Sequence, residues 1–256
     1  GGERTLLYGK TDRYIKELSV VLSDGNEYHI RPLLRTELEH AMQEQTFLGD
    51  AYRRMFALLE KNFDTIQNAK PHVSKNSAGY ALWNVWDKKT FDLTKLFAGS
   101  QGTLGITTEI QFQLIQPNSQ RVMLVLFLSS LEPLANLTNI LLKYNPESLE
   151  SYDDHTLSIA LKLFPSFIRK LKTNGVSLAL QFLPEALMVA RGGLPKLVLM
   201  AEFSGNDQAE VLMRAKAAQS GSKQFHILSR LAISEKEQAK YWTIRRESFN
   251  LLRQHV

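Results

Sequence analysis

The sequence predicts an α+β protein in two parts, the first mixing a β-hairpin with helices and the second alternating strands with helices. Asp24-Gly25 lies between two extended apolar runs, which is typical of a tight hairpin. Residues 106–116 alternate between apolar and polar, which is typical of a half-buried strand. Because Pro117-Asn118-Ser119 then breaks the pattern, we expect one domain over residues 1–117 and another over 118–256.

Hydrophobic spacing predicts the other elements. From Thr36 to about Asn68 the spacing is helical with an interruption near Gly49, so we expect two helices. Residues 71–105 are rich in turn residues, with at most a short helical turn over 91–97. In the second part, short links between elements favour an antiparallel sheet covered by helices. Its expected strands are 121–128, 148–152, 197–203 and 224–228, and its expected helices are 131–144, 154–172, 176–190, 207–219 and 234–254.

Composition excludes several classes of protein. The 256 residues include no cysteine, which removes thiol nucleophiles, iron–sulfur clusters and thiolate zinc sites held by this chain. The formal net charge is +5, but the basic residues come only in pairs among acids, so we expect no nucleic-acid partner. Apolar runs are far shorter than the ~20 residues of a membrane span, and no signal peptide core is present. We therefore expect a cytoplasmic or matrix protein without an integral membrane span.

The most informative motif is Gly99-Ser100-Gln101-Gly102-Thr103-Leu104-Gly105, in which three glycines recur every three residues. It lacks the Gly-Lys-Ser/Thr of a P-loop, and it precedes a strand rather than a helix. Backbone N–H groups of a glycine-rich turn can still bind an anion without a helix. The spacing alone leaves two interpretations open, a nucleotide-contacting loop and a tight turn, and it favours the tight turn.

Five segments in order resemble one family. They are Gly1-Gly2-Glu3-Arg4 with Tyr8-Gly9-Lys10-Thr11, Leu18–Leu22 with Asp24-Gly25, Lys75–Tyr80, Asp92–Phe97, and Gly99–Gly105 with Ile106-Thr107-Thr108-Glu109. The series resembles the FAD-linked oxidases of the vanillyl-alcohol oxidase and p-cresol methylhydroxylase (PCMH) type, in the D-lactate and D-2-hydroxyglutarate dehydrogenase branch. Leu183-Pro184-Glu185, Gly192–Pro195 and Ala201–Gly205 look like the cap domain of that branch. Gln101 departs from the pattern, since the family usually has glutamate there.

The resemblance implies a fold, a reaction and a cofactor site. Residues 1–117 would be the second half of a PCMH-type FAD-binding domain, and 118–256 a C-terminally truncated substrate-binding cap. The reaction would be oxidation of a D-2-hydroxy acid to the 2-oxo acid by hydride transfer to flavin. The cofactor contacts carried over are Gly1, Gly2, Tyr8, Gly9, Ser100, Gly102, Thr103, Gly105 and Ile106.

The resemblance also implies that this chain is a middle piece. Family members have a preceding subdomain that wraps the FAD pyrophosphate and a following segment with metal-binding and general-base histidines. We therefore expect the general base to lie outside the chain, and this piece alone to bind FAD weakly or not at all. The alternative function is a non-catalytic folded module that keeps the fold without FAD.

Arg245 is the candidate substrate-binding residue. Ser234-Glu235-Lys236-Glu237 is a capping box, and the helix it begins should place Trp242, Arg245 and Phe249 along one side, with Arg246 pointing elsewhere. Chemistry alone favours an internal salt bridge or an arginine that extends to water. In the resembling branch the arginine of Trp-x-x-Arg binds the substrate carboxylate, which implies the same role for Arg245.

No metal site is predicted within the chain. The six histidines include no pair at i, i+3 or i, i+4, so a helical metal site is not supported. Asp153-Asp154-His155 is acidic, and we interpret Asp154 as the N-cap of the following helix.

Overall fold

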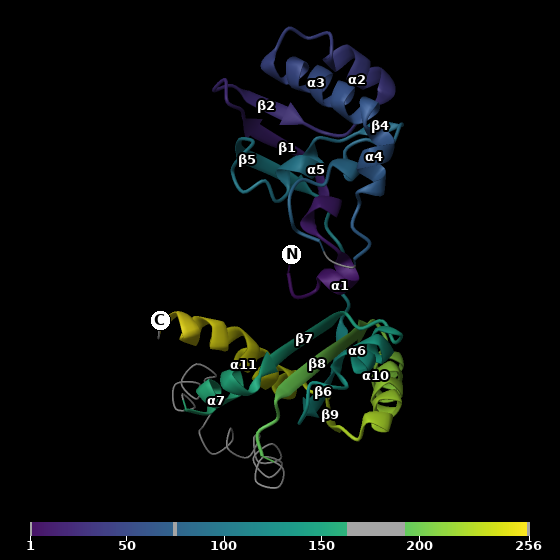
Figure 1. Cartoon of the computed structure of the whole chain (residues 1–256), viewed down its shortest axis with the longest axis vertical. Coiled ribbons are helices and arrows are strands. Elements are labelled where there is room, and N and C mark those ends of the chain that lie inside the picture. The colour runs from purple at the N-terminus through teal and green to yellow at the C-terminus, as the bar shows by residue number, and fades with distance from the viewer. Residues whose placement is uncertain (1, 74–75, 163–192, 255–256) are drawn as a thin grey trace. The chain divides into compact units, whose positions relative to one another are not determined.

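A computed structural model describes residues 2–73, 76–162 and 193–254. The chain divides into two compact units (Figure 1). The first unit contains residues 1–2 and 9–116, and the second contains residues 3–8 and 117–256. Residues 3–8, which the sequence placed in the first domain, therefore fall in the second unit.

A three-stranded antiparallel sheet forms the first unit's centre, in the order β2-β1-β5. The hairpin of β1 (Ile15–Val21) and β2 (Glu27–Ile30) is confirmed, with Gly25 at a φ of 82° in its turn. Strand β5 (Ile106–Phe112) pairs with the other edge of β1. The unit's other elements are η1 (Thr11–Arg13), β3 (Leu33–Leu34), α2 (Arg35–Ala41), α3 (Phe47–Lys61), α4 (Phe63–Asn68), η2 (Leu82–Asn84), β4 (Thr90–Phe91) and α5 (Thr94–Phe97).

Strand β5 differs from its prediction. The alternation over 106–116 predicted one buried face, but β5 ends at Phe112 and all seven of its residues are exposed. Two irregularities shift its register against β1, and the second one places Ile106 on the opposite face from Ile110. The apolar residues of the pattern are thus divided between the two faces, and β5 is one of the two edge strands of its sheet.

The predicted helix interruption near Gly49 is present, but it lies before that glycine, over residues 42–46. The chain leaves helix at Met42 and re-enters it at Phe47, where Thr46 caps α3 by accepting from the Gly49 N–H at 3.0 Å. A Cβ on Gly49 would contact the backbone oxygens of Glu44 and Ala41. Glycine is therefore present for close approach of the preceding loop, not to end a helix. Three helices, not two, occupy the segment 35–68.

Strands of the second unit form a four-stranded antiparallel sheet in the order β7-β8-β6-β9. One apolar cluster joins it to α6 and α10, and another joins it to α11, so helices cover both faces (Figure 1). This confirms the predicted antiparallel sheet with helical cover. Its elements are α1 (Thr5–Tyr8), β6 (Gln120–Leu128), α6 (Leu134–Leu142), β7 (Ser148–Asp153), α7 (Asp154–Lys162), β8 (Leu197–Gly205), α10 (Gln208–Ser222), η3 (Lys223–Phe225), β9 (Leu228–Ala232) and α11 (Glu235–Gln254).

The last strand is the one misplaced element of that sheet among the described residues. We expected a strand over 224–228, but Lys223–Phe225 is a 3-10 turn and β9 begins at Leu228. His226 takes a left-handed φ of 54°, which separates the turn from the strand. The expected helix 176–190, the second half of the helix expected over 154–172, and Leu183-Pro184-Glu185 lie outside the described residues.

The contact at Gly49 predicts an unfavourable Gly49→Ala substitution. Alanine is the better helix former by about 1 kcal/mol, yet its Cβ would overlap fixed backbone oxygens, so we expect a net loss of about 1–3 kcal/mol of stability. Thermal melting measures it. The control is Ala57→Gly at an exposed position of the same helix, which reports the propensity term alone. A Gly49→Ala protein more stable than wild type would contradict the close approach.

Candidate functional site

A cavity of about 330 Å³ lies within the first unit. It is bounded by the segment that precedes β1, by the loop before η2, by α5 with the residues after it, and by one face of β5. The lining residues are Lys10, Thr11, Asp12, Ile15, Ser77, Gly79, Ala81, Phe97, Ala98, Gly99, Ile110 and Phe112. Segments about 90 residues apart in sequence thus form one site because β5 pairs with β1.

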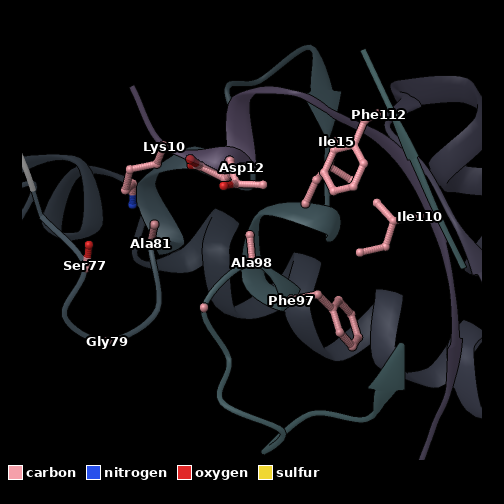
Figure 2. A pocket seen from close by; sticks show the side chains of 12 residues that line it. Lys10, Asp12, Ile15, Ser77, Gly79, Ala81, Phe97, Ala98, Ile110 and Phe112 are labelled. Carbon is pink, nitrogen blue, oxygen red and sulfur yellow. The ribbon is translucent and has the colours of Figure 1, made fainter. Parts of the chain in front are cut away.

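Polar and apolar side chains lie at different ends of this cavity. Figure 2 shows Lys10 and Ser77 at one end, and Ile110 and Phe112 at the other. Asp12 lies between the two ends, and its residue is only 7% exposed. A cavity of this kind suits a ligand with an apolar ring at one end and polar groups at the other.

The glycine motif forms a tight turn. The Thr103 N–H donates to the Ser100 carbonyl at 3.1 Å, and Gln101 and Gly102 between them both have positive φ, of 56° and 78°. That combination defines a type I′ turn, for which glycine is favoured. The Thr103 hydroxyl donates to the same carbonyl and contacts the Tyr80 hydroxyl. The tight-turn interpretation therefore describes the local structure.

The same turn leaves room beside its backbone. No atom lies within 4 Å of a Cβ built on Gly99 or Gly102, and Gly99 lines the cavity. Open backbone at positive φ is what close approach of a nucleotide requires, so these two residues fit FAD. Gly105 has a different reason to be glycine, since its Cβ would lie 2.7 Å from the Val21 carbonyl oxygen.

The other residues carried over from the resemblance do not gather at the cavity. Ser100, Gly102, Thr103, Gly105, Gly9 and Ile106 are absent from its lining. Ile106 is 72% exposed, and a Cβ on Gly9 would meet the Arg13 guanidinium. Tyr8 ends α1 and belongs to the second unit, whereas Gly2 belongs to the first unit. Gly1 lies outside the described residues, and the cofactor role of this set stays a prediction.

Arg245 forms an ion pair in the second unit. Its Nη2 donates to Oε2 of Glu150 on β7 at 3.2 Å, and the two side chains are 36% and 20% exposed. The internal salt bridge that the sequence left open is therefore present. Binding of a substrate carboxylate by Arg245 stays a prediction.

Arg246, not Arg245, has its guanidinium over the Trp242 ring, which corrects the expected orientation. Its Cζ lies 5.0 Å from the ring centroid, the spacing of a cation–π contact. It also pairs with both carboxylate oxygens of Glu3, at 3.0 and 2.7 Å. This contact lowers the pKa of Glu3, because Arg246 donates hydrogen bonds to the charged carboxylate. The expected neighbour Phe249 lies where side chains are not described.

A buried pair of glutamates beneath α11 was missed by sequence reasoning. Glu147 pairs with Arg4 at 2.8 Å and with Arg121 at 3.5 Å, and its side chain is fully buried. Glu202 on β8 accepts from the Trp242 indole N–H at 3.3 Å. Burial raises the pKa of the Glu202 carboxyl, and the nearby Glu147 charge raises it further.

Asp153, Asp154 and His155 are the one group of three potential metal-ligating residues that lies close together in the described part of the chain. Asp153, rather than Asp154 as expected, caps α7 by accepting from the Thr156 N–H at 2.9 Å. Asp154 instead pairs with Lys196 at 2.8 Å, and this contact lowers the pKa of Asp154 to about 2. The middle carboxylate of the group, that of Asp154, is therefore already paired with Lys196.

Comparison with known proteins finds distant relatives over most of the chain. No family model matches the chain. The D-2-hydroxyglutarate dehydrogenase of Pseudomonas putida is 24% identical over 256 residues, which is 98% of this chain. The chain is thus similar over nearly its whole length to a D-2-hydroxyglutarate dehydrogenase. The Escherichia coli D-2-hydroxyglutarate dehydrogenase is 26% identical over 84% of the chain, and the Bacillus subtilis glycolate oxidase subunit GlcD is 28% identical over 62%. The chain spans only 24%, 20% and 24% of these three relatives.

Solved structures support the fold of this chain. Alkyldihydroxyacetonephosphate synthase matches all of the chain with a TM-score of 0.58 at 12% identity, and the chain covers 35% of that protein. A second crystal form of the synthase gives a TM-score of 0.57. This likeness confirms the predicted α+β class. Among the helices that the structure describes, none combines the length and apolarity needed to cross a membrane.

The glycine turn yields a test that separates its two roles. In the intact flavoprotein, Gly102→Ala should lose most of its flavin while losing only about 1–2 kcal/mol of folding stability to backbone strain. The reason is that the added methyl group occupies the open side of the turn. Gly105→Ala should instead lower the melting temperature, because its Cβ meets β1. Flavin absorbance per chain and thermal melting are the measurements. Full flavin retention in Gly102→Ala would leave only the tight-turn role.

The raised pKa of Glu202 predicts a pH-dependent effect on stability. The folded carboxyl binds its proton more tightly than the unfolded one, whose ordinary pKa is 4.5, so this stabilisation is lost as the pH rises above about 4.5. Glu202→Gln should stabilise the protein near pH 7 and change little near pH 4. Denaturant unfolding at several pH values measures the difference. Glu235→Gln at an exposed position is the control, and an equal effect of both variants would contradict the burial argument.

Proposed function

We propose that this chain is part of an FAD-dependent enzyme that oxidises a D-2-hydroxy acid to the 2-oxo acid. The observation that carries the proposal is the similarity to D-2-hydroxyglutarate dehydrogenase over 98% of the chain. The flavin, when bound, accepts the hydride, and the protein supplies orientation and charge complementarity. Hydroxyglutarate and lactate are the two substrate types proposed.

Each unit contributes different groups in this proposal. Gly99 and Gly102 in the first unit offer open backbone to the cofactor. Arg245 in the second unit binds the substrate carboxylate through its planar fork, whose geometry matches a carboxylate bidentately. Glu150 supports this role by accepting from Nη2 and so fixing the plane of the guanidinium, since a hydrogen bond limits rotation of a long side chain.

Anaerobic flavin reduction tests the function directly. The intact protein should be yellow, and its flavin should be bleached by D-2-hydroxyglutarate or D-lactate while the L enantiomers leave it oxidised. Flavin that stays oxidised with every D-2-hydroxy acid contradicts the proposed reaction. A folded protein that retains no flavin supports the alternative, a non-catalytic module.

Substitution of Arg245 tests the substrate contact. Arg245→Met keeps the packing of the stem but removes the fork, and it should lower kcat/KM by roughly 30- to 1000-fold, about 2–4 kcal/mol. Arg246→Met is the matched control, since it breaks the pair with Glu3 and should leave kcat/KM within a few-fold.

A double variant separates binding from stability. Arg245→Met leaves the Glu150 carboxylate unpaired, so it should also lower the melting temperature. Arg245→Met with Glu150→Gln should restore stability without restoring kcat/KM. Normal kinetics in Arg245→Met, together with a lowered melting temperature, would make the arginine structural only.

A further inference from the structure

Charged side chains of the second unit gather around the candidate substrate arginine of α11. Glu3, Glu147 and Glu150 each have a guanidinium nitrogen within 3.5 Å, and a fourth glutamate, Glu202, lies buried beside Trp242. We call this group the α11 charge cluster. Its members are Arg4, Arg121, Arg245, Arg246, Glu3, Glu147, Glu150 and Glu202.

Glu202 differs from the other three glutamates in its hydrogen-bond donor. The residue is 2% exposed, its Oε1 accepts from the Trp242 indole N–H at 3.3 Å, and its Oε2 has no hydrogen-bond partner among the residues that the structure describes. An indole is a neutral donor, so it offsets less of the cost of burying a negative charge than a guanidinium does. Glu202 is therefore the member of the cluster that most readily holds a proton.

Charged groups act on Glu202 from four parts of the second unit. Glu147, which precedes β7, favours the neutral form of Glu202. The charged form is favoured by Arg4 before α1, by Arg121 on β6 and by Arg246 on α11. Burial has the largest effect, and together with the Glu147 charge it raises the pKa of Glu202 above the ordinary 4.5. A further charge close to Glu202 will therefore shift the carboxyl between its two forms.

The proton on Glu202 sets the net charge of the α11 charge cluster. When every member is charged the cluster is neutral, and an added carboxylate makes it negative. When Glu202 is protonated, one positive charge is in excess and an added carboxylate restores neutrality. Arg245 follows Trp242 by one helical turn, so a carboxylate bound at Arg245 lies close enough for its charge to act on Glu202.

We propose that Glu202 takes up one proton when the substrate carboxylate binds at Arg245, which keeps the α11 charge cluster neutral. Glu202 is then a positioning residue, because it acts through the charge of the cluster and does not touch the substrate. The inference rests on the proposed function, in which Arg245 binds the carboxylate.

Thermodynamic linkage fixes the direction of the pH dependence. The bound carboxylate raises the pKa of Glu202 further above 4.5, and protonated Glu202 strengthens carboxylate binding by the same factor. Affinity should therefore be highest where Glu202 is already protonated in the free protein. It should fall as the pH rises from the pKa of the free form to that of the bound form.

Isothermal titration calorimetry of the intact protein measures the proton uptake. The ligands are 2-oxoglutarate and pyruvate, the products of the two proposed substrate types, and each is titrated in pairs of buffers that differ in ionisation enthalpy. Wild type should take up a proton on binding, with a maximum of about one per site. Its Kd should rise at least about fivefold between about pH 5 and about pH 8.

Three variants identify the group that takes up the proton. Glu202→Gln fixes the neutral form, so it should bind tightly at every pH and take up no proton. Trp242→Phe removes a donor that favours the charged form, so it should move the uptake to higher pH. Glu235→Gln, at an exposed position of the same helix, is the control and should bind and take up protons like wild type.

Steady-state kinetics separate this role from a structural one. KM for the D-2-hydroxy acid should rise with pH in wild type and stay flat in Glu202→Gln, while the pH profile of kcat is the same in both. Wild-type binding without proton uptake overturns the inference, and so does uptake that survives in Glu202→Gln. Absence of oxo acid binding at about 10 mM overturns it as well, because an arginine-anchored carboxylate should bind more tightly than this.

Failure of this inference can be told from failure of the proposed function. Flavin that is reduced by D-2-hydroxy acids, together with pH-independent oxo acid binding, would remove the inference and keep the function. Glu202-dependent proton uptake in a protein whose flavin no D-2-hydroxy acid reduces would keep the carboxylate site and remove the proposed reaction.

Discussion

Pairing of β5 with β1 is the contact on which the first unit's site depends. It joins the segment before β1, which supplies Lys10 and Asp12, to the segment after α5, which supplies Gly99 and the exposed face of β5. The close approach at Gly105 is part of this pairing, because a side chain there would meet the β1 backbone. Without the pairing neither the cavity nor the position of the glycine turn would exist, since nothing local to either segment holds them together.

In the second unit, ion pairs hold α11 in place. Helix α11 carries two adjacent arginines that pair with different carboxylates, Arg245 with Glu150 and Arg246 with Glu3. The indole of Trp242 lies between a cation on one side and the buried Glu202 carboxyl on the other. Each of these contacts joins α11 to β7, β8 or the residues before α1, so the orientation of the helix and the state of its arginines are set together.

Local sequence patterns predicted the helices and strands well, but they predicted poorly which residues each element packs against. The hairpin at Asp24-Gly25 and the strands of the second sheet were predictable because turn chemistry and apolar runs act over a few residues. The interruption near Gly49 lies a few residues earlier than predicted, because that glycine allows close approach of the loop rather than ending a helix. The predicted burial of β5 was wrong because register shifts against β1 are not visible in its own sequence. The Glu147–Glu202 pair depends on strand pairing across 55 residues. The cavity could not be predicted for the same reason, although its glycine turn could.

Strand β5 has a physical consequence for solution behaviour. It is an edge strand whose seven residues are all exposed, with Ile106 on one face and Ile110 and Phe112 on the other. Edges with unpaired backbone and apolar side chains recruit strands from other molecules unless charge or cover prevents it. Glu109 is the acidic residue of this strand and the single formal charge along it. Self-association through this edge should therefore rise with protein concentration, since a single charge along the strand offers little repulsion.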